Sequence, residues 1–157
     1  MPAQALKSFL DSSGVNYSVI PHARAFTAHE IAHEAHVSGD EFAKTVIVKL
    51  DGELAMAVLR ASDRLNLDVM RHATGANEVE LASETEFQSR FPDCETGAMP
   101  PFGNLYEMPV YVDEALAADP SIAFNAGNHR ELFHLDYADF ERLVEPRVVR
   151  LSVRHDA

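Results

Sequence analysis

The sequence lacks three features that would each define a class of protein. It has one cysteine, Cys94, so an internal disulfide and a cysteine-based zinc cluster are excluded. Its longest uninterrupted apolar run, residues 54–59, is far shorter than the roughly 20 residues that span a bilayer. No positively charged start leads into an apolar stretch, which argues against a secretory signal. We therefore expect a cytoplasmic protein without a membrane partner.

Linker-like segments, internal repeats and low-complexity tracts are also missing. The 157 residues are about the length of one domain. Apolar residues make up 46% of the chain and charged residues 24%, close to the average of soluble globular proteins, so intrinsic disorder is not expected. The composition predicts a single domain over residues 1–157.

Basic residues are scarce, and lysine is the scarcer kind. Thirteen Lys and Arg stand against 25 Asp and Glu, a net charge of −12, and only three of the thirteen are lysines. Proteins that wrap nucleic acid usually carry the opposite sign, because phosphate contacts supply much of the affinity. The composition therefore argues against extensive duplex binding, and we expect no DNA partner. It is still compatible with a small site that touches one or two phosphates.

Hydrophobic periodicity and turn signals predict a mixture of helices and strands. The clearest prediction is a β-hairpin, with strands at 44–50 and 53–60 joined by the turn Asp51-Gly52. Helices are expected at 3–13, 27–35, 66–74, 83–90 and 137–144. Further strands are expected at 15–20, 78–81, 110–112, 122–124, 132–135 and 148–153. This order predicts an α+β fold, a mixed sheet or barrel with packed helices, rather than a doubly wound fold.

One segment matches a zinc-peptidase motif. His29-Glu30-Ile31-Ala32-His33 fits H-E-x-x-H on a predicted helix, where histidines at i and i+4 share a face and can hold zinc. Ile31, Ala35 and Val37 would form the buried side of this helix, which leaves both histidines largely on the polar side. No zincin-type continuation with a further histidine follows. We interpret the segment as a solvated face, keep a zinc peptidase as a remote alternative, and expect no metal or other cofactor.

Three other segments carry unusual residues. Lys44 begins the clearest predicted strand. The stretch 93–109 is expected to be a long loop, in which Gly97 and two fixed prolines can hold backbone N–H groups towards a ligand carbonyl or an attacking water. The segment 124–129 is a strand that runs into a turn with Asn and Gly. Taken singly, Lys44 also fits an ordinary charge at a strand edge, the loop an ordinary connection, and the segment 124–129 an ordinary turn. Cys94, just before the loop, is interpreted as a half-buried apolar residue rather than a nucleophile.

Together these segments resemble the YbaK/prolyl-tRNA-synthetase-associated editing domains, the free-standing aminoacyl-tRNA deacylases. The resemblance runs through nearly the whole chain, and its pieces come in the family's order. They are Thr27-Ala28, Ala43-Lys44-Thr45-Val46, Asp63-Arg-Leu-Asn-Leu-Asp68, the G-x-x-x-P loop Gly97-Ala-Met-Pro-Pro101 with Phe102-Gly103, a strand ending in Asp113, Asn125-Ala-Gly127 with His129, and the helix Asp139-Phe-Glu-Arg-Leu-Val144. Each piece is weak alone, whereas the ordered set is fairly specific.

The resemblance implies hydrolysis of mischarged aminoacyl-tRNA, for small amino acids such as Ala, Cys or Ser, most directly on tRNA-Pro. Lys44 would hold the terminal phosphate or the ester oxygen as a cation. The backbone from Gly97 to Pro101 would orient the carbonyl and a water or the neighbouring ribose hydroxyl. Contacts to the substrate would come from Thr27, Met99, Phe102, Gly103, Asn125, Gly127 and His129. The partners implied are the acceptor end of aminoacyl-tRNA and a prolyl-tRNA synthetase.

An aminoacyl ester is already activated, so positioning and polarisation of its carbonyl can suffice without a strong nucleophile. This fits the lack of a Ser-His-Asp or Cys-His signature. The chain departs from the family pattern at Ala98, where many relatives carry a second glycine, and at Pro100, where they often carry a small polar residue. Both changes stiffen or crowd the loop. A non-catalytic module of the same fold, which binds aminoacyl-tRNA or another small ligand, is therefore the alternative.

Overall fold

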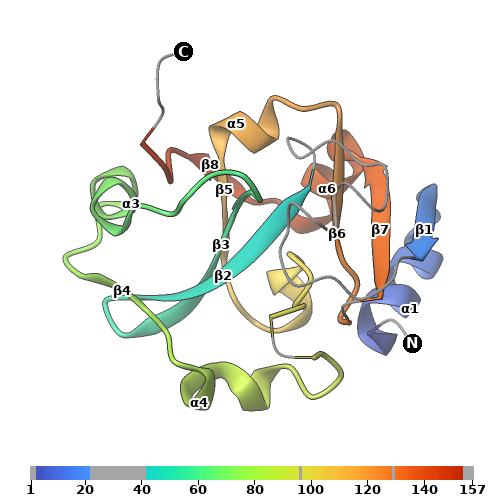
Figure 1. Ribbon diagram of the computed structural model, residues 1–157, viewed down its shortest axis with the longest axis horizontal. Coiled ribbons are helices and arrows are strands. Elements are labelled where there is room, and N and C mark those ends of the chain that lie inside the picture. Colours follow the sequence, from blue (N-terminus) through green and yellow to red (C-terminus); the bar gives the residue numbers. More distant parts are fainter. Residues whose placement is uncertain (1–2, 22–41, 96, 129, 154–157) are drawn as a thin grey trace.

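Figure 1 shows the computed structural model, which describes residues 3–21, 42–95, 97–128 and 130–153. The strands are β1 (Tyr17–Pro21), β2 (Ala43–Leu50), β3 (Glu53–Arg60), β4 (Val79–Leu81), β5 (Val110–Asp113), β6 (Ser121–Asn125), β7 (Glu131–Asp136) and β8 (Arg147–Val149). The α-helices are α1 (Gln4–Ser13), α3 (Leu67–Thr74), α4 (Glu84–Phe87), α5 (Glu114–Ala117) and α6 (Tyr137–Val144), and two short 3-10 helices are η1 (Gln88–Arg90) and η2 (Gly103–Leu105).

The predicted hairpin forms as β2 and β3, paired antiparallel from Ala43 opposite Arg60 to Leu50 opposite Glu53. Its two-residue turn has positive φ at both positions, 50° at Asp51 and 88° at Gly52. These angles belong to the turn type that matches the twist of the flanking strands. The Asp51 carboxylate also accepts hydrogen bonds from the backbone N–H groups of Asn77 and Glu78, at 3.0 and 2.9 Å.

The strands form two sheets. A five-stranded sheet has the order β4-β2-β3-β5-β8, with β5 parallel to both β3 and β8 and the other pairs antiparallel. A three-stranded antiparallel sheet has the order β1-β7-β6. A parallel bridge between Phe42 and Ala123 links the start of β2 to β6. The α+β fold with a mixed sheet is confirmed.

The core occupies both faces of the larger sheet. Alternate residues of β3 belong to different clusters: Met56 and Val58 pack into the main core, and Ala55 and Ala57 pack into a smaller cluster with Met70 of α3. A strand that is buried on both faces needs apolar residues at consecutive positions. The apolar run 54–59 of the sequence is therefore this central strand. Among the described residues, no helix is both long and apolar enough to cross a membrane.

In the second half of the chain one prediction was wrong and one helix was not predicted. The last strand ends at Val149 instead of residue 153, because the backbone N–H of Leu151 turns to the Asp113 carboxylate (2.8 Å) and its carbonyl accepts from Asn66. Helix α5 was not predicted. It has four residues, too few for a hydrophobic period, and it starts where the Asp113 side chain accepts from the N–H of Ala115.

Candidate active site

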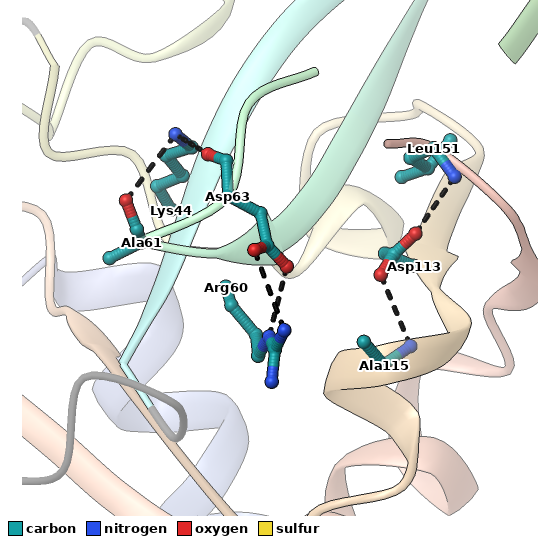
Figure 2. A network of polar contacts seen from close by, with 7 residues as sticks. All are labelled: Lys44, Arg60, Ala61, Asp63, Asp113, Ala115 and Leu151. Atoms are coloured by element: carbon teal, nitrogen blue, oxygen red, sulfur yellow. Dashed lines mark hydrogen bonds and ion pairs between the residues drawn. The ribbon is translucent and has the colours of Figure 1, made fainter. Parts of the chain in front are cut away.

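Lys44 lies second in β2, and its half-buried side chain reaches the turn that follows β3. Its ammonium donates to the backbone carbonyls of Asp63 and, at 3.4 Å, of Ala61 (Figure 2). Burial lowers the pKa of Lys44 from its ordinary value of 10.5, with the Asp63 carboxylate opposing this shift and the Arg64 guanidinium adding to it. The predicted cation of the site is therefore a desolvated lysine held by backbone carbonyls.

The turn that binds Lys44 is itself fixed in place. The Arg60 guanidinium donates through Nε to the Asp63 carboxylate at 2.9 Å, and the Asp63 N–H donates to the Arg60 carbonyl at 2.9 Å. The Ala61 N–H donates to the carbonyl of Phe42 at 2.7 Å, which ties the turn to the start of β2. In Figure 2 the Asp63 carbonyl faces Lys44 and its carboxylate faces Arg60. The position of the ammonium thus follows from the hairpin register.

The loop 97–101 is anchored at Ala98. The Ala98 N–H donates to the Glu95 carbonyl at 3.1 Å, and the Ala98 carbonyl accepts from Gly127 at 3.0 Å. The Glu95 N–H in turn donates to the Gly127 carbonyl at 2.7 Å. Residues 98–101 are buried, whereas Gly97 is exposed and has a φ of +83°. The predicted loop forms, and its backbone is bonded to the turn that follows β6.

Asn125 and Gly127 lie at the end of β6. Asn125 is the last residue of this strand, and its buried side-chain oxygen has no hydrogen-bond partner within the described part of the chain. Buried polar atoms are nearly always paired, so an unpaired one is a feature expected at a functional site. Gly127 has a φ of +93°, and a Cβ added to it would lie 2.6 Å from the Cβ of Ala3. Gly127 therefore also has a structural task, to let the N-terminal segment approach the loop.

These three segments meet where the two sheets touch. Phe42 pairs with Ala123 in the parallel direction, and Lys44 and Asn125 each lie two residues beyond that bridge. Side chains two residues apart in a strand project from the same face. Two residues further along the chain, Gly127 binds Ala98 of the loop. The start of β2, the end of β6 and the loop 97–101 therefore converge in one region.

Two predicted contact residues lie in the core. The Phe102 side chain is fully buried, with its ring against those of Phe9, Phe124 and Phe140. Gly103 is buried too, and an added Cβ would lie 2.4 Å from the carbonyl oxygen of Met108. Both residues therefore pack in the core next to the loop 97–101. Direct contact between them and a substrate stays a prediction, and packing already accounts for both residue types.

Met99 faces a cavity of about 210 Å³ beside α4 and η1. The lining residues are Glu84, Phe87, Gln88, Phe91, Pro92, Cys94, Glu95 and Met99. Cys94 is half-buried, its sulfur lies 3.5 Å from the hydroxyl of Tyr106, and burial raises the pKa of its thiol to about 12. A thiol with this pKa carries almost no thiolate at neutral pH, and the thiolate is the nucleophile. The interpretation of Cys94 as a structural residue is supported.

Three sequence predictions fall outside the described residues: Thr27, the segment 29–33 with the zinc-peptidase motif, and His129. Residue-by-residue reading also missed the ion pair between Arg60 and Asp63, although the sequence carried a signal for it. Opposite charges three residues apart, directly after a predicted strand that pairs with the Lys44 strand, indicate a charged turn beside that lysine. The Lys44 ammonium binds this turn through the backbone carbonyls of Ala61 and Asp63, and a pattern of residue types does not predict hydrogen bonds to backbone carbonyls.

Comparison with known proteins identifies the family of this chain. The family model described as the aminoacyl-tRNA editing domain matches residues 22–143. The chain is 26% identical to the multifunctional Ser/Thr-tRNA deacylase ProXp-y of Escherichia coli (strain K12), over 93% of this chain and 90% of the relative. It is 28% identical to a proline–tRNA ligase of Bacillus cytotoxicus, over 72% of this chain but only 19% of the ligase.

A solved structure supports the same fold. A crystal structure provisionally described as a trans-editing enzyme for prolyl tRNA synthetase aligns with a TM-score of 0.82 and 21% identity, over 97% of both chains. The family match spans well over half of the sequence and includes Lys44, the loop 97–101 and the end of β6. This protein therefore belongs to the aminoacyl-tRNA editing domain family.

Proposed function

We propose that this protein is a trans-editing hydrolase that deacylates mischarged aminoacyl-tRNA. The observation that carries the proposal is the convergence of Lys44, Asn125 and the loop 97–101 within a chain of the editing family. The relative of matching length is named for deacylation of Ser- and Thr-tRNA, which supports a substrate with a small amino acid. The whole chain, residues 1–157, would act as one domain in the cytoplasm.

The chemistry needed is attack on an ester carbonyl that is already activated. A water molecule, oriented by the loop or by the neighbouring ribose hydroxyl, adds to the carbonyl carbon. The ester C–O bond then breaks, and the ribose oxygen leaves and takes a proton from solvent. The products are the free amino acid and tRNA with an intact terminal hydroxyl. Positioning and polarisation of this kind supply most of the rate gain in many enzymes.

Each segment supports one part of this reaction. Lys44 would bind the terminal phosphate or the ester oxygen as a cation. In the loop, Pro100 and Pro101 have no N–H, and the Ala98 N–H already binds Glu95. This leaves Gly97 and Met99 as the loop N–H groups that would polarise the carbonyl. The Asn125 amide, at the end of β6, would contact the aminoacyl group.

Specificity would come from the size of the pocket. The buried residues Ala98, Pro100 and Pro101 make this part of the loop stiff, so that it would exclude larger side chains by steric overlap. Such a wall distinguishes single methylene groups by only about 1–3 kcal/mol. We therefore expect a set of small substrates, Ala, Cys or Ser, rather than one amino acid. The match to part of a proline–tRNA ligase supports tRNA-Pro as the carrier and prolyl-tRNA synthetase as a functional partner.

A panel of mischarged tRNAs tests the proposal. Wild type should release Ala, Cys or Ser from tRNA-Pro, and Lys44→Ala should lose about 10- to 100-fold in kcat/KM, the range for a hydrogen bond to a charged group. Lys49→Ala is the matched control, because Lys49 lies on the same strand but forms ion pairs with Glu80 and Glu86. If wild type binds the tRNAs but hydrolyses none of them, the non-catalytic module is the correct interpretation.

A further inference from the structure

A concave surface adjoins the candidate site on the other side of the turn that binds Lys44. Its volume is about 420 Å³, and it is lined by Ser62, Asp63, Arg64, Leu65, Asn66 and Val153. Asp63 belongs to both places, because its carbonyl accepts from the Lys44 ammonium and the residue also forms part of the concave wall. Whatever fills this surface would lie next to a group bound by Lys44.

Among the described residues, the lining of this surface contains one cation, Arg64, and one carboxylate, Asp63. The Asp63 carboxylate, the one carboxylate in the described part of the lining, is paired with the Arg60 guanidinium at 2.9 Å. Arg64 is exposed, and among the described residues its guanidinium has no ion-pair partner. It is close enough to Lys44 to lower the pKa of that lysine. Among the described residues that these contacts connect, the three cations Lys44, Arg60 and Arg64 stand against the carboxylate of Asp63, in a chain with a net charge of −12.

Some other exposed arginines are locally neutral. Arg71 on α3 is paired with Asp68 at 2.9 Å, and Arg142 on α6 is paired with Asp139 at 3.0 Å. The concave surface also has an apolar component, formed by Leu65 and by Val153, whose side chain is 50% exposed. A cation without a partner beside exposed apolar surface suits a ligand that combines an anionic group with a flat or apolar one. A nucleotide has that composition.

We propose that this concave surface binds the single-stranded 3′ end of tRNA, with Arg64 on the phosphodiester that precedes the aminoacylated nucleotide. The inference rests on the proposed function in the form in which Lys44 contacts the ester oxygen, so that Arg64 contacts the phosphate that precedes the aminoacylated nucleotide. A guanidinium forms two parallel hydrogen bonds to a phosphate, and apolar surface packs against a ribose or base. With a net charge of −12 the chain is not suited to extensive phosphate contact, so we expect the contact with tRNA to be local.

Binding of a short single-stranded RNA with the acceptor-end sequence tests this directly. Fluorescence anisotropy across a salt series should show that Arg64→Ala binds at least tenfold more weakly than wild type. The slope of log K against log salt should fall by about 0.7, the value for one phosphate of a single strand. Arg142→Ala is the control, because it removes the same charge from α6, which lies to the right of centre in Figure 1 and far from α3. This variant should bind the RNA with an affinity within about twofold of wild type.

Turnover gives a second, independent readout. Arg64→Ala should raise KM for mischarged tRNA about tenfold with kcat unchanged, and should hydrolyse aminoacyl-adenosine, which lacks the preceding phosphate, as wild type does. Equal losses on both substrates, or an Arg64→Ala protein that binds RNA as well as Arg142→Ala does, would overturn the assignment. If wild type hydrolyses no ester, the proposed function fails, while the binding series still decides whether Arg64 holds RNA.

Discussion

The contact between Gly127 and Ala3 joins the N-terminal segment to the loop of the candidate site, and Gly127→Ala would disrupt it. Gly127 has a φ of +93°, and an added Cβ would lie 2.6 Å from the Ala3 Cβ and 3.0 Å from the Ala3 nitrogen. The same residue donates to the Ala98 carbonyl and accepts from the Glu95 N–H. The substitution therefore strains the backbone and also forces two packed segments apart.

The two effects can be separated by a matched variant. A non-glycine residue in the left-handed region costs about 1–2 kcal/mol, and overpacking of a buried contact adds about 1–3 kcal/mol. Gly75→Ala carries only the first cost, because Gly75 has a φ of +75° and no atom within 4 Å of an added Cβ. We expect the free energy of unfolding to fall by about 2–5 kcal/mol in Gly127→Ala and by about 1–2 kcal/mol in Gly75→Ala.

Urea denaturation and thermal melting measure this difference. In a domain of this size 1 kcal/mol corresponds to about 2–4 °C, so Gly127→Ala should melt about 2–12 °C below Gly75→Ala. Adding Ala3→Gly to Gly127→Ala removes the closest contact and should restore part of the loss. Equal melting temperatures for the two single variants would refute the reasoning, since they would show that Ala3 does not pack against Gly127.

Three further predictions concern Asp113, Cys94 and Lys44. Asp113→Ala should lower the free energy of unfolding, measured in urea, by about 2–4 kcal/mol, because the fully buried carboxylate accepts hydrogen bonds from the N–H groups of Leu151 and Ala115 (Figure 2). Asp113→Asn should lower this free energy by less, and an equal loss in the two variants would argue against these hydrogen bonds. With a pKa raised by burial from 9.0 to about 12, Cys94 should react with iodoacetamide at pH 8 roughly a thousandfold more slowly in the native than in the unfolded protein, and similar rates would contradict its burial. Burial also lowers the pKa of Lys44, so kcat/KM, corrected for spontaneous hydrolysis, should fall as pH rises through a value below 10.5. In Lys44→Arg that alkaline limb should move to higher pH, and an unchanged limb would mean that Lys44 is not the titrating group.

The net charge of −12 has a different meaning once the positions of the cations are known. From composition alone it argues against wrapping of nucleic acid. In the structure, Arg60 and Asp63 neutralise each other, and Lys44 and Arg64 leave local positive charge beside the candidate site. An acidic protein can therefore hold one end of a tRNA at a small basic site. Under the proposed function, the net charge limits how much of a tRNA the protein contacts and is compatible with contact at its 3′ end.

Local structure was predictable wherever the interactions that cause it are local. The hairpin β2–β3 depends on two apolar strand segments and on the Asp-Gly turn between them, all within 18 residues of the sequence. Helix α1 ends at Gly14, which has a φ of 72°, because glycine adopts that conformation without strain. Patterns of this range can be read directly, and most of the other helices and strands follow from them. The four-residue helix α5 has no such pattern.

The sequence by itself also determined which residue types the site contains, through the ordered motifs around Lys44, residues 97–101 and Asn125. Only the tertiary structure decided how these residues are arranged and which of them are buried. It brought the motifs together through the bridge between Phe42 and Ala123, and it placed Phe102 in the core behind the loop. The physical reason is range: turn and helix preferences act over a few residues, whereas burial, sheet pairing and the local sum of charges depend on segments far apart in the chain.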